Sequence, residues 1–212
     1  MRNRLFKIAE RRKAQIKTDF VRYLYDDMDW SQALILIKGA RGSGKTTLLL
    51  QHYKNNPEHA IYLSLDDFYF ESNRLLLLIE SLYEEGFRRF YLDEVHQYQY
   101  WSKDFKNLYD NYSDIQLIAT GSSALQIDKG AADLSRRMTV YQLYGLSFRE
   151  YVLFELGVNL PILSLEDLLE NHQVYSHQIS DQLDVLKYFE SYLKKGYYPF
   201  YKTAGQQYHQ KQ

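Results

Sequence analysis

The sequence contains no cysteine among its 212 residues. This absence excludes disulfide bonds, cysteine-ligated zinc, iron–sulfur clusters and thiol nucleophiles. A bias toward one sign of charge is also absent, because 26 Lys and Arg residues stand against 27 Asp and Glu residues, for a formal net charge of −1. No bulk charge therefore draws the whole chain toward nucleic acid or an anionic membrane.

Long apolar stretches are missing as well. The longest of them, such as Leu75 to Ile79, are far shorter than the ~18 residues that a membrane-spanning helix needs. The first residues alternate charged with apolar side chains and lack the uninterrupted apolar segment of a signal peptide. These absences predict a soluble, cytoplasmic protein with no membrane partner.

Tyrosine, in contrast, is abundant, with 21 residues within an aromatic total of 16%. Because a tyrosine tolerates one end in water, these residues indicate packing in and around a core. A base-stacking surface for RNA is the alternative, and no RNA-binding motif accompanies the tyrosines.

Residues 1–30 are interpreted as a basic amphipathic helix. Apolar residues recur there at helical spacing, at Leu5, Ile8, Ala9, Ile16, Phe20 and Leu24. Eight basic side chains precede residue 23 against two acidic ones, a local balance of +6. A solvated helix face explains this charge, and contact with nucleic acid is the alternative.

From Ala33 the pattern changes to five short β-rich runs separated by helical segments. The runs begin at Ala33, Ala60, Arg88, Ile115 and Met138, and helices are expected at 45–54, 75–85 and 102–112. The runs are continuously apolar rather than alternating, which is typical of strands buried on both faces. Residues 31–145 are therefore predicted to form an α/β core, a parallel sheet with helices on both sides.

Residues 146–202 are predicted to be helical. Ser147 and Glu150 have the spacing of a capping box, which begins a helix. We expect helices at 147–156, a short one from 164, and one from about 180 to 195. The polar residues 203–212 are expected to be disordered.

The motif GARGSGKT at residues 39–46 matches the G-x-x-x-x-G-K-[ST] pattern of a phosphate-binding loop. Glycines let several N–H groups converge on one phosphate, and the following helix adds the positive end of its dipole. Lys45 would reach the β- and γ-phosphates, Thr46 would ligate Mg²⁺, and Thr47 would donate to the α-phosphate. The nucleotide-binding residues expected from the loop are Gly39, Gly42, Ser43, Gly44, Lys45, Thr46 and Thr47.

An acidic pair, Asp93 and Glu94, ends the third run. The carboxyl edge of a parallel sheet is where ligands bind in such folds. Asp93 would therefore hold Mg²⁺, and Glu94 would orient or deprotonate an attacking water. Two solvated carboxylates are the alternative. A glutamate beside a metal-binding aspartate favours hydrolysis, and ATP is favoured over GTP because no N-K-x-D motif is present.

Three further groups of residues are candidates for the same chemistry. Thr120 and Ser122 end the fourth run and are candidates to sense the γ-phosphate, unless Ser122 or Ser123 caps the next helix. Arg137, with its neighbour Arg136, precedes the fifth run and is a candidate to stabilise transition-state charge within the chain or from a neighbouring subunit, unless it forms an exposed ion pair. A small-molecule kinase would instead use Asp66 and Asp67 on an acceptor and the two arginines on a lid. His96 has no assigned role.

Six motifs in order resemble the prokaryotic AAA-type ATPases whose nucleotide-binding domain is usually followed by a C-terminal domain of uncharacterised function. They are GARGSGKTTLL, YLSLDD at 62–67, LDEVHQY with Trp101, ATGSSA at 119–124, YQLYGLSFREY at 141–151 and GYYPFY at 196–201. The resemblance implies a three-layer P-loop core with strand order 5-1-4-3-2, ATP hydrolysis, and a helical lid after the fifth strand. It departs at Arg136, where the family usually has glycine, and related chains continue beyond the last motif.

The sequence thus predicts an ATPase of the AAA type that uses ATP and Mg²⁺. Two other functions stay open: an ATP-gated module that binds DNA or protein with little turnover, and a small-molecule P-loop kinase. A homo-oligomer and a DNA or protein partner are left open as well.

Overall fold

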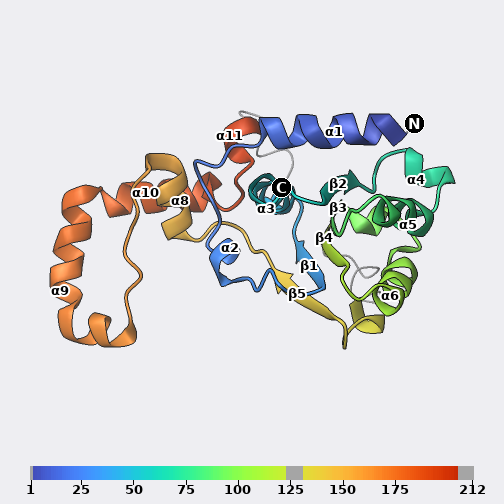
Figure 1. The fold of residues 1–212 in the computed structure, drawn as a ribbon. Helices are drawn as coiled ribbons and strands as arrows, with labels where there is room; N and C mark the ends of the chain where they lie inside the picture. Colours follow the sequence, from blue (N-terminus) through green and yellow to red (C-terminus); the bar gives the residue numbers. More distant parts are fainter. Residues whose placement is uncertain (1, 123–130, 205–212) are drawn as a thin grey trace. The chain divides into compact units, whose positions relative to one another are not determined.

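Five parallel strands form one sheet in the order β2-β3-β4-β1-β5 in the computed structural model (Figure 1). The strands are β1 (Leu34–Gly39), β2 (Ala60–Ser64), β3 (Arg89–Asp93), β4 (Gln116–Ser122) and β5 (Met138–Gln142). Counted from the other edge, this is the expected order 5-1-4-3-2, so the predicted sheet is confirmed. β1 lies between β4 and β5 and is buried over almost its whole length.

The structure describes residues 2–122 and 131–204 and divides into two units, Met1–Tyr144 and Gly145–Gln212. The end of the 119–124 motif and the proposed capping role of Ser123 lie outside the described residues. The same holds for the polar tail from residue 205. Residues 203 and 204, expected in that tail, belong to the short helix α11 (Tyr201–Ala204).

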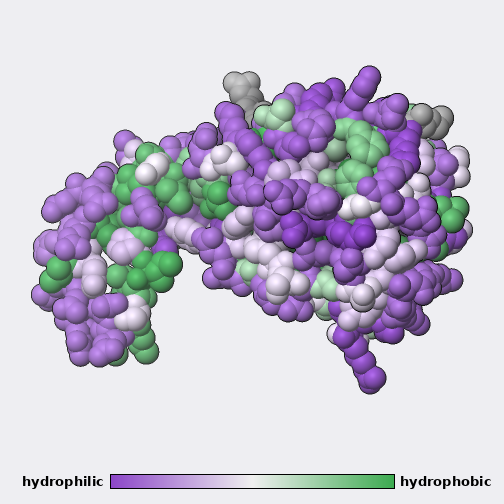
Figure 2. Space-filling model, in the orientation of Figure 1, coloured by the Kyte–Doolittle hydropathy of each residue, from purple (hydrophilic) through white to green (hydrophobic). Residues whose placement is uncertain are grey.

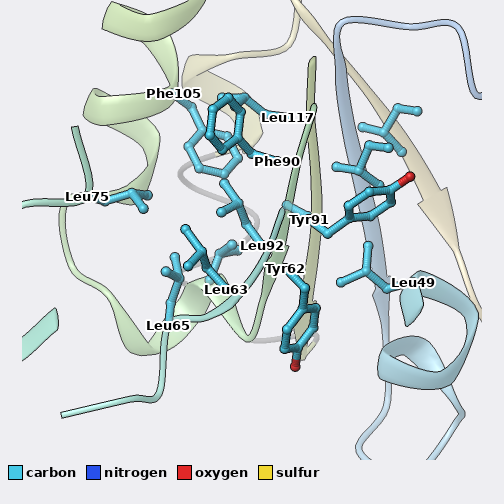
Figure 3. Close-up of a cluster of buried hydrophobic side chains, with 14 of the residues drawn as sticks. Leu49, Tyr62, Leu63, Leu65, Leu75, Phe90, Tyr91, Leu92, Phe105 and Leu117 are labelled. Atoms are coloured by element: carbon cyan, nitrogen blue, oxygen red, sulfur yellow. The ribbon is translucent and has the colours of Figure 1, made fainter. Parts of the chain in front are cut away.

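Helices cover both faces of the sheet, as the continuously apolar strands require. Figure 3 shows Tyr91 of β3 pointing toward Leu49 on one side, while Phe90 and Leu92 point to the other side, where Leu75 and Phe105 lie. Leu49 belongs to α3 (Lys45–Asn55); Leu75 and Phe105 belong to α5 (Leu75–Glu84) and α6 (Trp101–Asn111). The result is the predicted three-layer arrangement, and these three helices begin and end within one residue of expectation.

The N-terminal segment is not the single helix that the sequence predicts. Helix α1 (Arg2–Gln15) ends early, and only the four-residue α2 (Leu24–Asp27) follows. Side chains of α3 explain the break, because the Gln51 amide donates to the carbonyls of Lys17 and Phe20 at 2.9 and 2.8 Å. These bonds fix the carbonyls outside a helix. α1 itself packs on α3 and on the edge strand β2, and buries Leu5 and Ala9.

Two short segments were not anticipated from the sequence. Helix α4 (Tyr69–Ser72) follows β2, and the 3₁₀ turn η1 (Val95–Gln97) follows β3. η1 begins two residues after the end of β3 and α4 begins five residues after the end of β2, so both lie in connections that leave the carboxyl edge of the sheet.

The second unit is helical. It contains α8 (Phe148–Leu156), α9 (Leu165–Gln182), α10 (Val185–Ser191), a π-helical turn η2 (Tyr192–Gly196) and α11. The capping boxes at Ser147 and Ser164 are confirmed, each with both reciprocal hydrogen bonds. The expected helix from Ser180 begins instead at Val185, because the Asp184 side chain caps α10 through the Lys187 N–H at 3.1 Å.

Much of the second unit is lightly packed. Neither α9 nor α10 contains a buried residue, and green apolar residues lie on the face of this unit seen in Figure 2. The exposed apolar side chains include Leu165, Leu169, Leu186 and Leu193. In residues 2–122 and 131–204, no helix has both the length and the apolar character needed to cross a bilayer.

Candidate nucleotide-binding site

The GARGSGKT motif forms the connection between β1 and α3, where the sequence pattern requires a phosphate-binding loop. Gly42 and Gly44 have φ of 84° and 100°, a left-handed conformation that side chains with a Cβ rarely adopt. Gly39 is required for another reason, since a Cβ there would lie 2.2 Å from the carbonyl oxygen of Leu143, just after β5. The glycines therefore serve both the turn and the contact between β1 and the chain after β5.

Lys45, the first residue of α3, folds back over the loop. Its Nζ donates to the carbonyl oxygens of Gly39 at 3.0 Å and Ala40 at 2.9 Å, and the side chain is buried. Burial lowers the pKa of the ammonium, and the carboxylates of Glu94 and Asp93 partly oppose this shift. The only lysine of the loop thus lies at its centre, close to both acidic candidates.

Asp93, at the end of β3, is the point where three strands and the loop meet. Its Oδ1 accepts a hydrogen bond from Thr46 Oγ1 of α3 at 3.1 Å and another from Thr120 Oγ1 of β4. Its Oδ2 accepts from the Tyr62 hydroxyl of β2 at 2.8 Å. Asp93 and Thr46, the two residues expected to hold Mg²⁺, therefore lie in direct contact.

Glu94 follows in a left-handed conformation, with φ of 55°. Its backbone N–H donates to Thr120 Oγ1 at 3.1 Å, so one hydroxyl holds both acidic residues in place. Burial, reinforced by the charge of Asp93, raises the pKa of the Glu94 carboxyl. A carboxylate with a raised pKa is suited to accept a proton.

His96, to which the sequence assigned no role, lies beside Glu94. Its Nδ1 is 3.2 Å from Glu94 Oε2 and 3.4 Å from the backbone nitrogen of Ser122. Ser122 is therefore at the site through its backbone. Thr47 lies on the exposed side of the first turn of α3.

Arg137 is not brought to this edge of the sheet. It precedes β5, whose first residue Met138 pairs with Leu34 at the start of β1, whereas the loop follows the end of β1. Its guanidinium pairs with Asp110 at 3.0 Å, and this is the exposed ion pair of the alternative interpretation. A role for Arg137 in the site of its own chain has no geometric support. Its neighbour Arg136 is exposed.

Asp67, a candidate to hold a kinase acceptor, is already engaged. Its Oδ1 accepts from the Arg4 guanidinium at 2.8 Å and from the Tyr69 backbone N–H at 3.0 Å. Asp66 accepts a hydrogen bond from Ser64 at 2.5 Å. These contacts make Asp67 part of the junction between α1 and α4.

Tyr62 is the site residue that the sequence analysis missed. In the YLSLDD motif it resembles an ordinary strand residue, and its face of the sheet becomes clear only from the register that pairs it with Tyr91. Its hydroxyl is buried, and burial together with the charge of Asp93 raises its pKa, so it stays a donor. The available signal was a tyrosine at the centre of β2, between the aliphatic residues Ile61 and Leu63.

Comparisons with known proteins identify the family of this chain. Residues 31–152 match the AAA domain family. An uncharacterised protein of Methanocaldococcus jannaschii is 34% identical over 203 residues, and the alignment covers 87% of this chain. The chain spans 41% of the length of that relative.

Two solved structures are similar in part. One is PCH-2 of C. elegans, at 17% identity and a TM-score of 0.44, over 72% of this chain and 43% of that one. The other is AMPPCP-bound DnaA from Aquifex aeolicus, at 18% identity and a TM-score of 0.40, over 81% of this chain and 58% of that one. The family match covers more than half of the chain and includes the loop and the acidic pair. The chain therefore belongs to the family of AAA domains.

Proposed function

We propose that this chain is an ATPase that binds ATP with Mg²⁺ and hydrolyses it to drive or gate a change in a partner. The observation that carries the proposal is the contact of Thr46 Oγ1 with Asp93 Oδ1 at 3.1 Å, which joins the phosphate loop to the acidic end of β3. In P-loop ATPases a hydroxyl and an aspartate in these positions hold the metal.

The donor set fits Mg²⁺. A hydroxyl and a carboxylate are the hard oxygen ligands that this ion prefers, and it commonly completes its shell with phosphates and water. Within the described part of the chain, no three acidic or histidine side chains are grouped as a metal site of their own. We therefore expect Mg²⁺ to bind together with the nucleotide, on Thr46 and Asp93, where it would neutralise charge on the β- and γ-phosphates.

The remaining chemistry is assigned to the protein's own side chains. Lys45 would exchange its loop carbonyls for β- and γ-phosphate oxygens. Glu94 would accept a proton from the water that attacks the γ-phosphorus, while the bond to the bridging oxygen breaks and ADP leaves with its electron pair. The Thr120 hydroxyl would keep the Asp93 carboxylate and the Glu94 backbone in place during the reaction.

Phosphate release from ATP and Mg²⁺ tests the proposal. Lys45→Ala is expected to weaken ATP binding by about 10- to 100-fold, the loss typical of a charge-assisted contact. Glu94→Gln is expected to keep binding and to lose about 10²- to 10⁴-fold in turnover, the range for a general base. The exposed residues Lys106 and Glu84 supply the matched controls, Lys106→Ala and Glu84→Gln.

Normal hydrolysis by Glu94→Gln would overturn the assigned base, and absence of ATP binding by the unmodified chain would overturn the function. Tight binding without turnover would instead favour a nucleotide-gated binding module. One observation supports that second candidate. Four exposed basic side chains on or just after α1 have no salt bridge within the described part of the chain: Lys7, Arg11, Arg12 and Lys17. A parallel sample with DNA at two salt concentrations tests it, since phosphate contacts weaken with salt.

A further inference from the structure

A buried arginine outside the AAA family match contacts the phosphate loop. Arg22 lies between α1 and α2 and is 7% exposed. Its NH1 donates to the carbonyl oxygen of Ser43 at 2.6 Å, and its NH2 donates to the carbonyl oxygen of Tyr144 at 3.0 Å. An arginine is seldom buried unless its donors are matched in this way.

The Ser43 carbonyl belongs to the peptide whose N–H is that of Gly44. In a trans peptide the C=O and the N–H point in opposite directions, and the described chain has no cis peptide bond. The bond from Arg22 therefore directs the Gly44 N–H away from the guanidinium. A phosphate loop depends on such N–H groups all pointing to its concave side.

Among the described residues, Arg22 makes the only side-chain hydrogen bond to this peptide that the structure shows. Gly44 adopts φ of 100° because it lacks a Cβ, and the same freedom lets the peptide between Ser43 and Gly44 rotate at little cost. The Ser43 hydroxyl is fully buried and has no hydrogen-bond partner in residues 2–122 and 131–204, so it does not hold the peptide either. A rotated peptide would present a carbonyl oxygen where a phosphate needs a donor.

We propose that Arg22 is a positioning residue of the phosphate loop, which locks the Ser43–Gly44 peptide in the orientation that accepts the β-phosphate of a nucleotide. The proposal rests on the proposed nucleotide site. The second hydrogen bond of Arg22, to the carbonyl oxygen of Tyr144 in the segment that follows β5, keeps the planar guanidinium in one orientation. A lysine has a single ammonium group instead of a planar guanidinium with two terminal nitrogens. It cannot donate to the Ser43 and Tyr144 carbonyls with the same geometry.

The segment that carries Arg22 has an independent anchor, and this supplies a matched control. Gln51 of α3 donates to the carbonyls of Lys17 and Phe20 and makes no hydrogen bond to the loop. Gln51→Ala therefore loosens the same segment while leaving the Ser43 peptide bonded to Arg22.

The test measures the dissociation constants of ATP and ADP by titration, together with the melting temperature without nucleotide. We expect Arg22→Gln to weaken both nucleotides by about 10- to 100-fold, the loss typical of an interaction with a charged donor. Arg22→Lys is expected to fall between this variant and the unmodified chain. Gln51→Ala is expected to lower the melting temperature and to change either dissociation constant by less than about threefold.

The outcomes separate this inference from the proposed function. If the unmodified chain binds no ATP, the proposed function is wrong. If it binds ATP and a folded Arg22→Gln variant binds equally well, the function stands and the positioning role is wrong. A purely structural Arg22 would lower the melting temperature of Arg22→Gln and Gln51→Ala alike without a selective loss of affinity. If Arg22→Gln does not fold, Arg22→Lys and Gln51→Ala carry the same comparison.

Discussion

A buried carboxylate is stable only when its oxygens accept hydrogen bonds. Within the described residues, hydroxyl groups are the only donors to the Asp93 carboxylate. Three hydroxyl donors from three elements surround it, those of Tyr62, Thr46 and Thr120. Hydroxyls can rotate, so the same side chains can donate to Asp93 before a metal binds and offer lone pairs afterwards. The position of the Asp93 carboxylate is thus fixed in advance, while the hydroxyl groups around it can still reorient.

Glu94 has the opposite character, because burial of its carboxylate outweighs the opposing effect of the nearby Lys45. Burial and the neighbouring Asp93 raise its pKa above the ordinary value of 4.5. A raised pKa in the folded state means that the folded chain binds the proton more tightly than the unfolded chain. The favourable contribution of Glu94 is thus fully present below about pH 4.5 and is lost as the pH rises through the folded pKa.

Glu94→Gln is therefore expected to be more stable than the unmodified chain at pH 7. The gain should shrink as the pH falls and disappear near pH 4, where the glutamate is itself protonated and neutral. Urea denaturation at pH 4, 5.5 and 7 measures it, with Glu84→Gln on the exposed face of α5 as the control. A Glu94→Gln variant that is less stable at pH 7, or a gain that does not depend on pH, would contradict the assigned environment.

For single residues, the sequence predicted which motif residues belong to the site better than it predicted which side chains contact them. The spacing of the loop and the Asp-Glu pair at a strand end placed Lys45, Thr46 and Asp93 together correctly, because parallel strands all end at one edge. Tyr62 was missed since a single tyrosine in a buried strand does not show which face of the sheet it lies on, and only the register with β3 reveals this. Arg22 was counted only as one of the basic residues of the N-terminal segment, and burial alone separates it from them.

Among the elements, α1 is joined to the sheet more closely than its basic sequence suggests. It lies against β2, an edge strand whose free backbone groups would otherwise invite pairing with another chain. Leu5 and Ala9 form its buried stripe, and Arg2 and Arg4 pair with Glu85 and Asp67 of the core. Part of the basic charge thus serves to attach the helix.

Leu5→Ala is expected to lower the free energy of unfolding by about 2–4 kcal/mol, the usual cost of truncating a buried leucine. Urea denaturation measures it against Leu77→Ala in α5, where the leucine is 64% exposed and a loss within about 0.5 kcal/mol is expected. Equal and small losses in the two variants would mean that α1 is not part of the core of the first unit.

The elements of the core were predictable because their signals are local and strong. Outside the core, α8 was predicted equally well by its capping box, whereas the ends of α1, α9 and α10 were not predicted correctly. Buried strands read as apolar runs, and α3, α5 and α6 have clear ends. The helical spacing of apolar residues continued past Gln15, but tertiary hydrogen bonds from Gln51 overrode it. In the second unit the Ser-x-x-Asp cap marked where α9 begins, while nothing comparable marked its length.

For the molecule as a whole, the contrast between its two units has a consequence for local stability. β1 and β4 lie in the middle of the sheet with most of their residues buried, whereas α9 contains no buried residue. Regions with few buried contacts open locally, and central strands open only when the unit unfolds. Amide hydrogen exchange should therefore be slow in β1 and β4 and fast along α9.

Bound nucleotide should increase this difference in exchange rates. A ligand slows exchange only at those amides whose exchange requires an unfolding that releases the ligand. At a concentration of Mg²⁺-ATP about 100 times the dissociation constant, the amides of β1 and β4 should gain about 2.7 kcal/mol of protection. The amides of α9 should gain little, since their exchange passes through local opening that leaves the loop intact. The Lys45→Ala variant at the same ATP concentration is the control. Its expected 10- to 100-fold loss of affinity should reduce the gain in β1 and β4 to about 0.4–1.4 kcal/mol. Equal protection of α9 and β1 without nucleotide would show that α9 unfolds only together with the sheet, and the division into independently opening units would then be wrong.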